Sequence, residues 1–109
     1  MVHSGRDSSA AVFKAIADPT RREILGLLRE GGRSVGEVAA QFSASRPAIS
    51  RHLRLLRAAG LVTTRERGTV RICELNDVPL RAVDHWLRAY ETFWDQNLRH
   101  LKHFVEDNP

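Results

Sequence analysis

The fold is decided by residues 34–60, SVGEVAAQFSASRPAISRHLRLLRAAG, because this stretch contains two helix starts separated by a short break. Ser34 and Glu37 have the spacing of a capping box, in which each side chain hydrogen-bonds to the backbone N–H of the other residue. Ser45 is a second capping residue, and Gly60 ends the helix that follows it. Two capped helices joined by a three-residue turn predict a helix-turn-helix.

The second of these helices, residues 45–59, has two different faces. Ile49, Leu53 and Leu56 recur at helical spacing and are expected to face the core. A major groove admits one helix, and the first turns of that helix come closest to the base edges. We predict that this recognition helix reads DNA through its opposite face: Arg46, Pro47, Ala48, Ser50, Arg51 and Arg54. An ordinary amphipathic surface helix is the alternative.

Two further helices are expected before this stretch. The first begins at Ser8 or Ser9 and continues to about residue 16. Asp18-Pro19 ends it and starts the second helix, with the aspartate as N-cap and the proline in the first helical position. Gly31-Gly32 ends the second helix.

Beyond Gly60 the pattern changes to β-branched residues over 61–65 and 69–75, on either side of the turn Glu66-Arg67-Gly68. This pattern predicts a two-stranded hairpin whose glycine supplies a positive φ. We expect its polar side chains to reach phosphates or the minor groove: Thr64, Arg65, Arg67, Thr69 and Arg71. The same arginines could instead protect the strand edges from aggregation.

A long final helix is predicted from Asp77-Val78-Pro79 to about Glu106. Its apolar residues are spaced by three and four, as in a seam that faces another helix. The seam consists of Leu80, Val83, Leu87, Tyr90, Trp94, Leu98, Leu101 and Val105. A small domain has too little core to cover this seam together with Trp86 and Phe93, so we expect a partner subunit to cover it. A protein-interaction module that pairs through this helix with a different protein is the alternative.

The positive charge of the chain is concentrated in one third of its length. Residues 44–75 hold seven arginines and two glutamates, a net charge of +5, whereas the rest holds ten basic and eleven acidic residues, a net charge of −1. Such clustering is typical of a surface that binds a polyanion. A hydrated surface rich in arginine is the alternative explanation.

Length and composition restrict the class of protein. A chain of 109 residues fits one domain, which we divide into a flexible tail (1–7), a winged helix-turn-helix (8–76) and a dimerisation helix (77–109). No apolar run approaches the ~18 residues of a membrane-spanning helix. The single cysteine, Cys73, permits neither an intrachain disulfide nor a cysteine-cluster metal site, and we expect a cytoplasmic protein. No catalytic motif is present, so we expect no enzymatic activity.

Three segments together resemble the ArsR family of bacterial winged-helix repressors: residues 17–22, ADPTRR; residues 45–53, SRPAISRHL; and residues 59–62, AGLV. The similarity extends from Val12 to Val105. The resemblance implies a mainly α winged helix-turn-helix fold of order α-α-α-α-β-β-α and repression by a homodimer that occupies double-stranded operator DNA. It implies that the first and last helices form the dimer, which adds Val12 and Phe13 to the dimerisation residues. It also places residues 46–48, 50 and 51 at the base-reading end of the recognition helix, and Arg65, Arg67 and Thr69 in the wing.

Many members of this family sense metals, and this chain departs from their patterns. Residues 35–42 contain no cysteine, and Asp84-His85 are adjacent, so that on a helix they point about 100° apart. His100 and His103 supply only two good ligands, whereas zinc normally needs three or four. The aromatic residues 86, 90, 93 and 94 resemble a metal-independent branch that includes autorepressors. We therefore expect no metal or cofactor, and a metal- or small-ligand-sensing repressor that uses the C-terminal histidines is the alternative.

Overall fold

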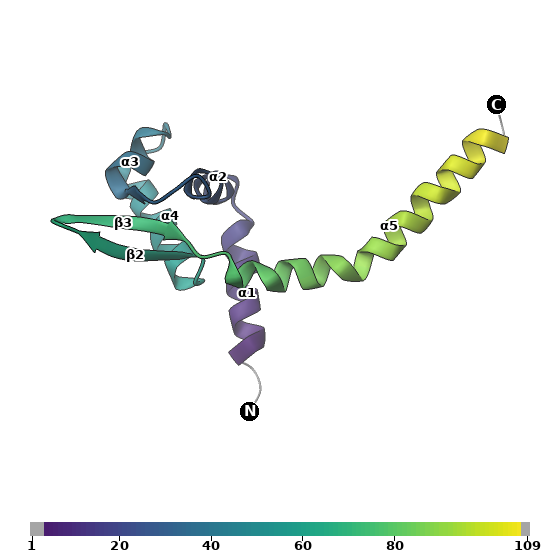
Figure 1. Ribbon diagram of the computed structural model, residues 1–109, viewed down its shortest axis with the longest axis horizontal. Coiled ribbons are helices and arrows are strands. Elements are labelled where there is room, and N and C mark those ends of the chain that lie inside the picture. The colour runs from purple at the N-terminus through teal and green to yellow at the C-terminus, as the bar shows by residue number, and fades with distance from the viewer. Residues whose placement is uncertain (1–3, 108–109) are drawn as a thin grey trace.

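The structure is a computed structural model that describes residues 4–107, of which residues 4–8 and 107 are described by their backbone alone. Its elements are α1 (Ser4–Ile16), α2 (Pro19–Leu28), β1 (Arg33–Ser34), α3 (Val35–Ala40), α4 (Arg46–Ala58), β2 (Val62–Arg67), β3 (Val70–Leu75), a 3-10 helix η1 (Val78–Leu80) and α5 (Arg81–Asp107). The first four helices and the sheet form one body, from which α5 extends as a long arm (Figure 1). The predicted order of helices and hairpin is confirmed.

Three helices begin at the capping residues that the sequence predicts. Asp18 accepts a hydrogen bond from the backbone N–H three residues along, at 3.0 Å. Ser34 and Glu37 cap each other, with distances of 2.9 Å and 3.1 Å. Ser45 likewise accepts from the third N–H of α4, at 3.3 Å. These bonds satisfy N–H groups that the first turn of a helix leaves without a partner.

The start of α1 differs from the prediction. The helix begins at Ser4, whereas the sequence suggested Ser8 or Ser9. Once one helical turn exists, each further residue adds a hydrogen bond at little cost, so the helix extends backwards past both serines to Ser4. The predicted tail is shortened accordingly, and its residues 1–3 lie outside the described residues.

The turn of the hairpin lies one residue further along than predicted. It consists of Gly68 and Thr69, since Arg67 pairs with Val70 and the pairing runs unbroken from there to Val62 and Leu75. Gly68 has a φ of +64°, as the first position of a two-residue hairpin turn often requires. The two-residue turn lets both strands extend to its edge, which lengthens the predicted first strand from residue 65 to Arg67.

A third strand, β1, was not predicted. It pairs antiparallel with β3 and places Arg33 opposite Cys73, so the sheet has the order β1-β3-β2. Gly32 makes this approach possible, because a Cβ there would lie 2.8 Å from Cγ2 of Ile72. The predicted hairpin is confirmed as β2 and β3, and the short strand β1 adds a third strand beside it.

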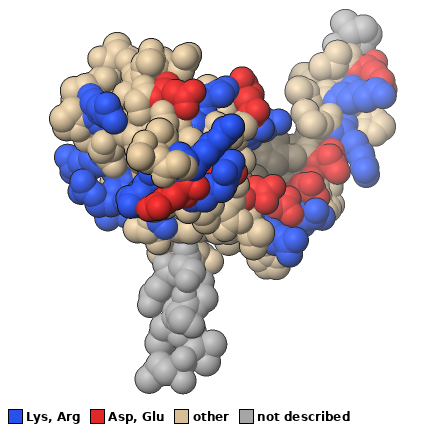
Figure 2. All heavy atoms as spheres, turned by 60° about the vertical axis from the view of Figure 1, so that its left-hand side comes forward, with Lys and Arg blue, Asp and Glu red and all other residues tan. Residues whose placement is uncertain are grey.

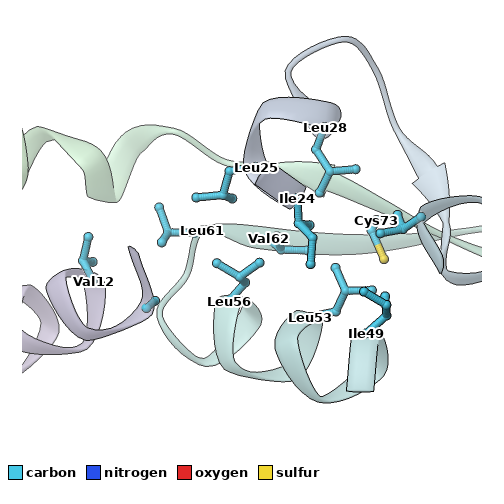
Figure 3. Close-up of a cluster of buried hydrophobic side chains, with 12 residues drawn as sticks. Val12, Ile24, Leu25, Leu28, Ile49, Leu53, Leu56, Leu61, Val62 and Cys73 are labelled. Atoms are coloured by element: carbon cyan, nitrogen blue, oxygen red, sulfur yellow. The ribbon is translucent and has the colours of Figure 1, made fainter. Parts of the chain in front are cut away.

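The core lies where α2 and α4 meet the sheet, and Figure 3 shows their side chains pointing toward one another. The residues predicted to face inward from α4, Ile49, Leu53 and Leu56, are at most 2% exposed. Each buried aliphatic side chain of this size stabilises the fold by about 1.5–3 kcal/mol. This packing fixes which face of α4 is left outside. None of the helices in residues 4–107 combines the length and apolar character that crossing a membrane requires.

Candidate nucleic-acid interface

The outer face of α4 carries the residues that the sequence assigns to base reading. Because Ile49, Leu53 and Leu56 anchor one side in the core, the other side faces outward. Arg46, Pro47, Arg51 and Arg54 are exposed, whereas Ala48 and Ser50 are half-buried at the edge of this face. The arginines can therefore reach outward while the short side chains keep the backbone close to an approaching surface.

Arg46 also contacts the helix before it. Its guanidinium lies 3.7 Å from the position that a Cβ on Gly36 would occupy, beside the first turn of α3. A Cβ at this position would be in ordinary van der Waals contact with the guanidinium, so the two groups are neighbours. Arg46 therefore lies at the flank of the exposed face, between α3 and α4, and the sequence pattern contained no signal for this pairing.

The wing, β2 and β3 with their turn, carries its arginines on two faces. Side chains alternate along a strand, so Arg65 and Arg67 share one face and Arg71 lies on the other, opposite Glu66. Nε of Arg65 donates to Oε1 of Glu74 at 3.0 Å. The predicted contacts of the wing are therefore not equivalent, because Arg65 has an acidic partner within the sheet.

The two threonines of the wing also differ in position. Thr64 is half-buried and pairs with the buried Cys73, on the face of the sheet that meets the core. Thr69 is exposed in the turn, next to Gly68. Of the two, Thr69 is the better placed to contact a molecule that lies along the wing.

The surface charge agrees with the distribution along the sequence. In Figure 2, with the side of the wing turned forward, basic side chains gather on the left and lower part of the body. Basic and acidic side chains alternate along α5 in the same view. The helix-turn-helix and the wing thus form a basic surface next to an arm of mixed charge.

A second surface runs along α5, where large apolar side chains are exposed. Trp86 contacts Phe13 of α1 with ring centroids 5.7 Å apart and Tyr90 with centroids 5.2 Å apart. Beyond this joint the predicted seam residues have about half or more of their surface exposed, and Trp94 reaches 62%. The exposed residues predicted for dimerisation are Leu87, Tyr90, Trp94, Leu98 and Leu101. An apolar face of this length on one helix is typical of an interaction surface.

Four of the residues predicted for dimerisation pack within the chain. Val12 is 2% exposed and belongs to the core, so its assignment to the dimer interface is corrected. Leu80 and Val83 are half-buried and pack against the same core. Phe13 is half-buried and contacts α5. The resemblance implied that the first and last helices form the dimer, but it could not distinguish apolar side chains covered by their own chain from those covered by a partner.

The candidate ligands for a metal do not come together. Among the described residues, no three histidine, cysteine, aspartate or glutamate side chains are placed to hold an ion. His100 and His103 are exposed on α5. Cys73 is buried in the sheet, and burial raises the pKa of its thiol, which keeps it protonated.

Comparison with known families and proteins gives a consistent result. Residues 18–64 match the family described as "Bacterial regulatory protein, arsR family". The chain is 38% identical to the transcriptional repressor SdpR of Bacillus subtilis over 80% of its own length and 97% of that protein. It is 41% identical to an HTH-type transcriptional regulator of Mycobacterium tuberculosis over 79% of its own length and 78% of that protein.

Solved structures show the same likeness in three dimensions. An ArsR-like transcriptional regulator from Rhodococcus sp. RHA1 is 31% identical and superposes with a TM-score of 0.70, over 91% of this chain and 93% of that one. A homodimeric winged helix-turn-helix DNA-binding domain from Mycobacterium bovis is 30% identical, with a TM-score of 0.64 over 78% of this chain and 82% of that one.

Proposed function

The chain belongs to the arsR family of bacterial regulatory proteins, and we propose that it is a transcriptional repressor that occupies an inverted-repeat operator as a homodimer. The observation that carries the proposal is the outer face of α4. It is held outward by the buried Ile49, Leu53 and Leu56, and it carries exposed arginines beside a basic wing. The names of the family and of the relatives describe regulators of transcription.

In this proposal α4 enters the major groove. Arg51 and Arg54 contact base edges or phosphates from the exposed face, while Ala48 and Ser50 permit close approach. Pro47 and Arg46 lie where the helix begins, which is the part of a recognition helix that comes closest to DNA. Arg67, Thr69 and the other predicted wing residues contact phosphates or the adjacent minor groove.

We further propose that the second copy covers the apolar face of α5. This is supported by the exposure of its seam and by the homodimeric form of the related domain from Mycobacterium bovis. A two-fold dimer presents two copies of α4, so it reads two half-sites in opposite orientation. Because the proposed ligand is chromosomal DNA, we place the protein in the cytoplasm.

Selection of binding sites from a pool of random duplexes tests the proposal. We expect the full chain to select an inverted repeat and to bind it with an affinity that falls steeply as salt is added, because phosphate contacts release counterions. Binding to all duplexes alike would contradict sequence-specific repression. A chain that binds no duplex, but forms a complex with another protein through α5, would favour the protein-interaction module.

A further inference from the structure

Arg21 connects the end of α1 to the recognition helix. Its Nε donates to the carbonyl oxygen of Ala15 at 2.6 Å, and its Nη2 donates to that of Lys14 at 3.2 Å. Its Nη1 lies 3.3 Å from Nδ1 of His52, which is on α4. Because a guanidinium can only donate, this contact is a hydrogen bond in the tautomer that leaves Nδ1 of His52 unprotonated. One side chain thus contacts both helices.

The backbone of Arg21 is hydrogen-bonded as well as its guanidinium. The backbone N–H of Arg21 donates to Oδ2 of Asp18, and the same oxygen lies 3.9 Å from Nδ1 of His52. The His52 side chain is 21% exposed, so the connection lies partly out of water. Because the guanidinium is planar and its donors have fixed directions, its bonds restrict the angle between the helices that it joins.

We propose that Arg21 is a positioning residue that sets the angle between α1 and α4, and through it the separation of the two recognition helices of the dimer. The inference rests on the proposed function, in which the second copy covers the apolar face of α5, the helix that packs on α1 through Phe13 and Trp86, and α4 enters the groove. Two-fold symmetry repeats any change of this angle in the second copy. A small rotation in each copy therefore alters the spacing between α4 and its symmetry mate.

Arg22 supplies a matched control on the next residue. Its Nη1 donates to the carbonyl oxygen of Ile16 at 2.7 Å, so it also caps the end of α1. Within the described residues it forms no hydrogen bond to α4. Arg22→Gln therefore removes a cap of α1 while it leaves the connection between Arg21 and His52 in place.

The experiment uses full-length Arg21→Gln, Arg22→Gln, His52→Leu and His52→Gln. The probes are the inverted repeat selected by the unmodified protein, two versions with the half-sites moved apart by one or two base pairs, and a single half-site. Fluorescence anisotropy gives the affinity for each duplex. Thermal melting followed by circular dichroism shows that the variants fold. His52→Leu breaks the contact from the other helix, whereas His52→Gln keeps a carbonyl acceptor.

The preference is the ratio of the affinity for the selected spacing to the affinity for an altered spacing. We expect Arg21→Gln and His52→Leu to lower this ratio at least about fivefold. Their affinity for the single half-site should stay unchanged. Arg22→Gln and His52→Gln should keep the preference. The inference is wrong if Arg21→Gln keeps it, if the single half-site is weakened by the same factor, or if Arg22→Gln behaves identically. If the unmodified protein selects no sequence, the proposed function fails and this inference fails with it. If the unmodified protein prefers the selected spacing and Arg21→Gln keeps that preference, the inference is rejected and the proposed function stands.

Discussion

The ring of Phe13 meets the indole of Trp86 edge-on, with ring centroids 5.7 Å apart. Such aromatic pairs contribute about 0.5–1.5 kcal/mol beyond the area that they bury. This pair joins α1 to α5 within one chain, at the point where α5 leaves the core. This contact therefore helps to set the direction in which the exposed apolar face of α5 extends.

Replacement of Trp94 by glutamate tests the dimer interface. Because Trp94 is 62% exposed in the single chain, the substitution should leave the core intact and weaken association by at least about 2 kcal/mol, roughly 30-fold. Sedimentation equilibrium measures the change. Gln96→Glu introduces the same charge on the polar side of α5 and should have little effect. An unchanged dimer in Trp94→Glu would show that another surface pairs the chains.

Replacement of Arg51 by alanine tests base reading. A lost bidentate contact to a base should cost about 1–3 kcal/mol on the selected operator and relax the sequence preference. Ser50→Ala should act in the same direction. Arg57→Ala, in the last turn of α4, is the control and should weaken binding less. Gel-shift titrations on matched and mismatched duplexes distinguish these outcomes, and equal affinities for all variants would remove α4 from the groove.

The wing should contribute through phosphates, and its arginines should contribute unequally. Arg67→Ala is expected to weaken binding to every sequence and to reduce the slope of log affinity against log salt by about 0.9. Arg65→Ala should change the slope less, because Glu74 accepts a hydrogen bond from Arg65 at 3.0 Å and already balances its charge. Affinities measured over a range of salt concentrations give both slopes. A larger effect of Arg65→Ala would contradict this assignment.

The helix caps predict a dependence of stability on acid. The pKa of Glu37 is lowered mainly by the backbone N–H of Ser34 and then by its hydroxyl, and the pKa of Asp18 is lowered mainly by the backbone N–H of Arg21. A lowered pKa in the folded state gives stability that is complete above the unfolded-state pKa and is lost as the pH falls through the folded-state value.

The melting temperature should therefore fall as the pH drops below about 4. Glu37→Gln keeps an oxygen acceptor for the cap but cannot titrate, so part of this decline should disappear. Glu23→Gln removes an exposed carboxylate of α2 for which the described residues show no hydrogen bond or ion pair, and it serves as the control. If both variants decline with the same slope, the capping carboxylates do not govern acid stability.

Metal ions should leave operator affinity unchanged. Cys73 is the only thiol of the chain and is buried, while His100 and His103 lack further ligands among the described residues. Two imidazoles bind zinc too weakly to supply the ~1–3 kcal/mol of coupling that allosteric release requires. Zinc, cadmium, arsenite or a chelator is titrated into the protein–operator complex while anisotropy is followed. A tenfold loss of affinity that His100→Ala abolishes would establish a sensor site.

Local chemistry explains why much of the fold could be predicted. The caps at Asp18, Ser34 and Ser45 act within three residues, so their spacing is visible in the sequence. The third strand was missed because it depends on Gly32 approaching Ile72, forty residues away, at a distance that excludes any side chain. Nothing in either segment alone indicates that approach.

In the candidate site too, features that depend on nearby residues could be predicted, whereas contacts between distant segments could not. Helical periodicity was enough to place Arg51 and Arg54 on the outer face of α4. The partner of Arg65 depends on strand register, and a turn misplaced by one residue changes which side chains face each other. The contact between Arg21 and His52 joins residues from two helices and appears only when the helices pack.

The position of α5 in the chain has a consequence for synthesis. Its 27 residues follow the last strand, so a ribosome completes every core segment from α1 to β3 before it begins the long arm. At about 5–20 residues per second, making the arm takes roughly 1–5 s. The residues that read DNA are therefore synthesised before the residues that pair two copies. Ribosomes that follow one another on a single messenger RNA release their chains close together, which favours pairing because subunit assembly depends on concentration.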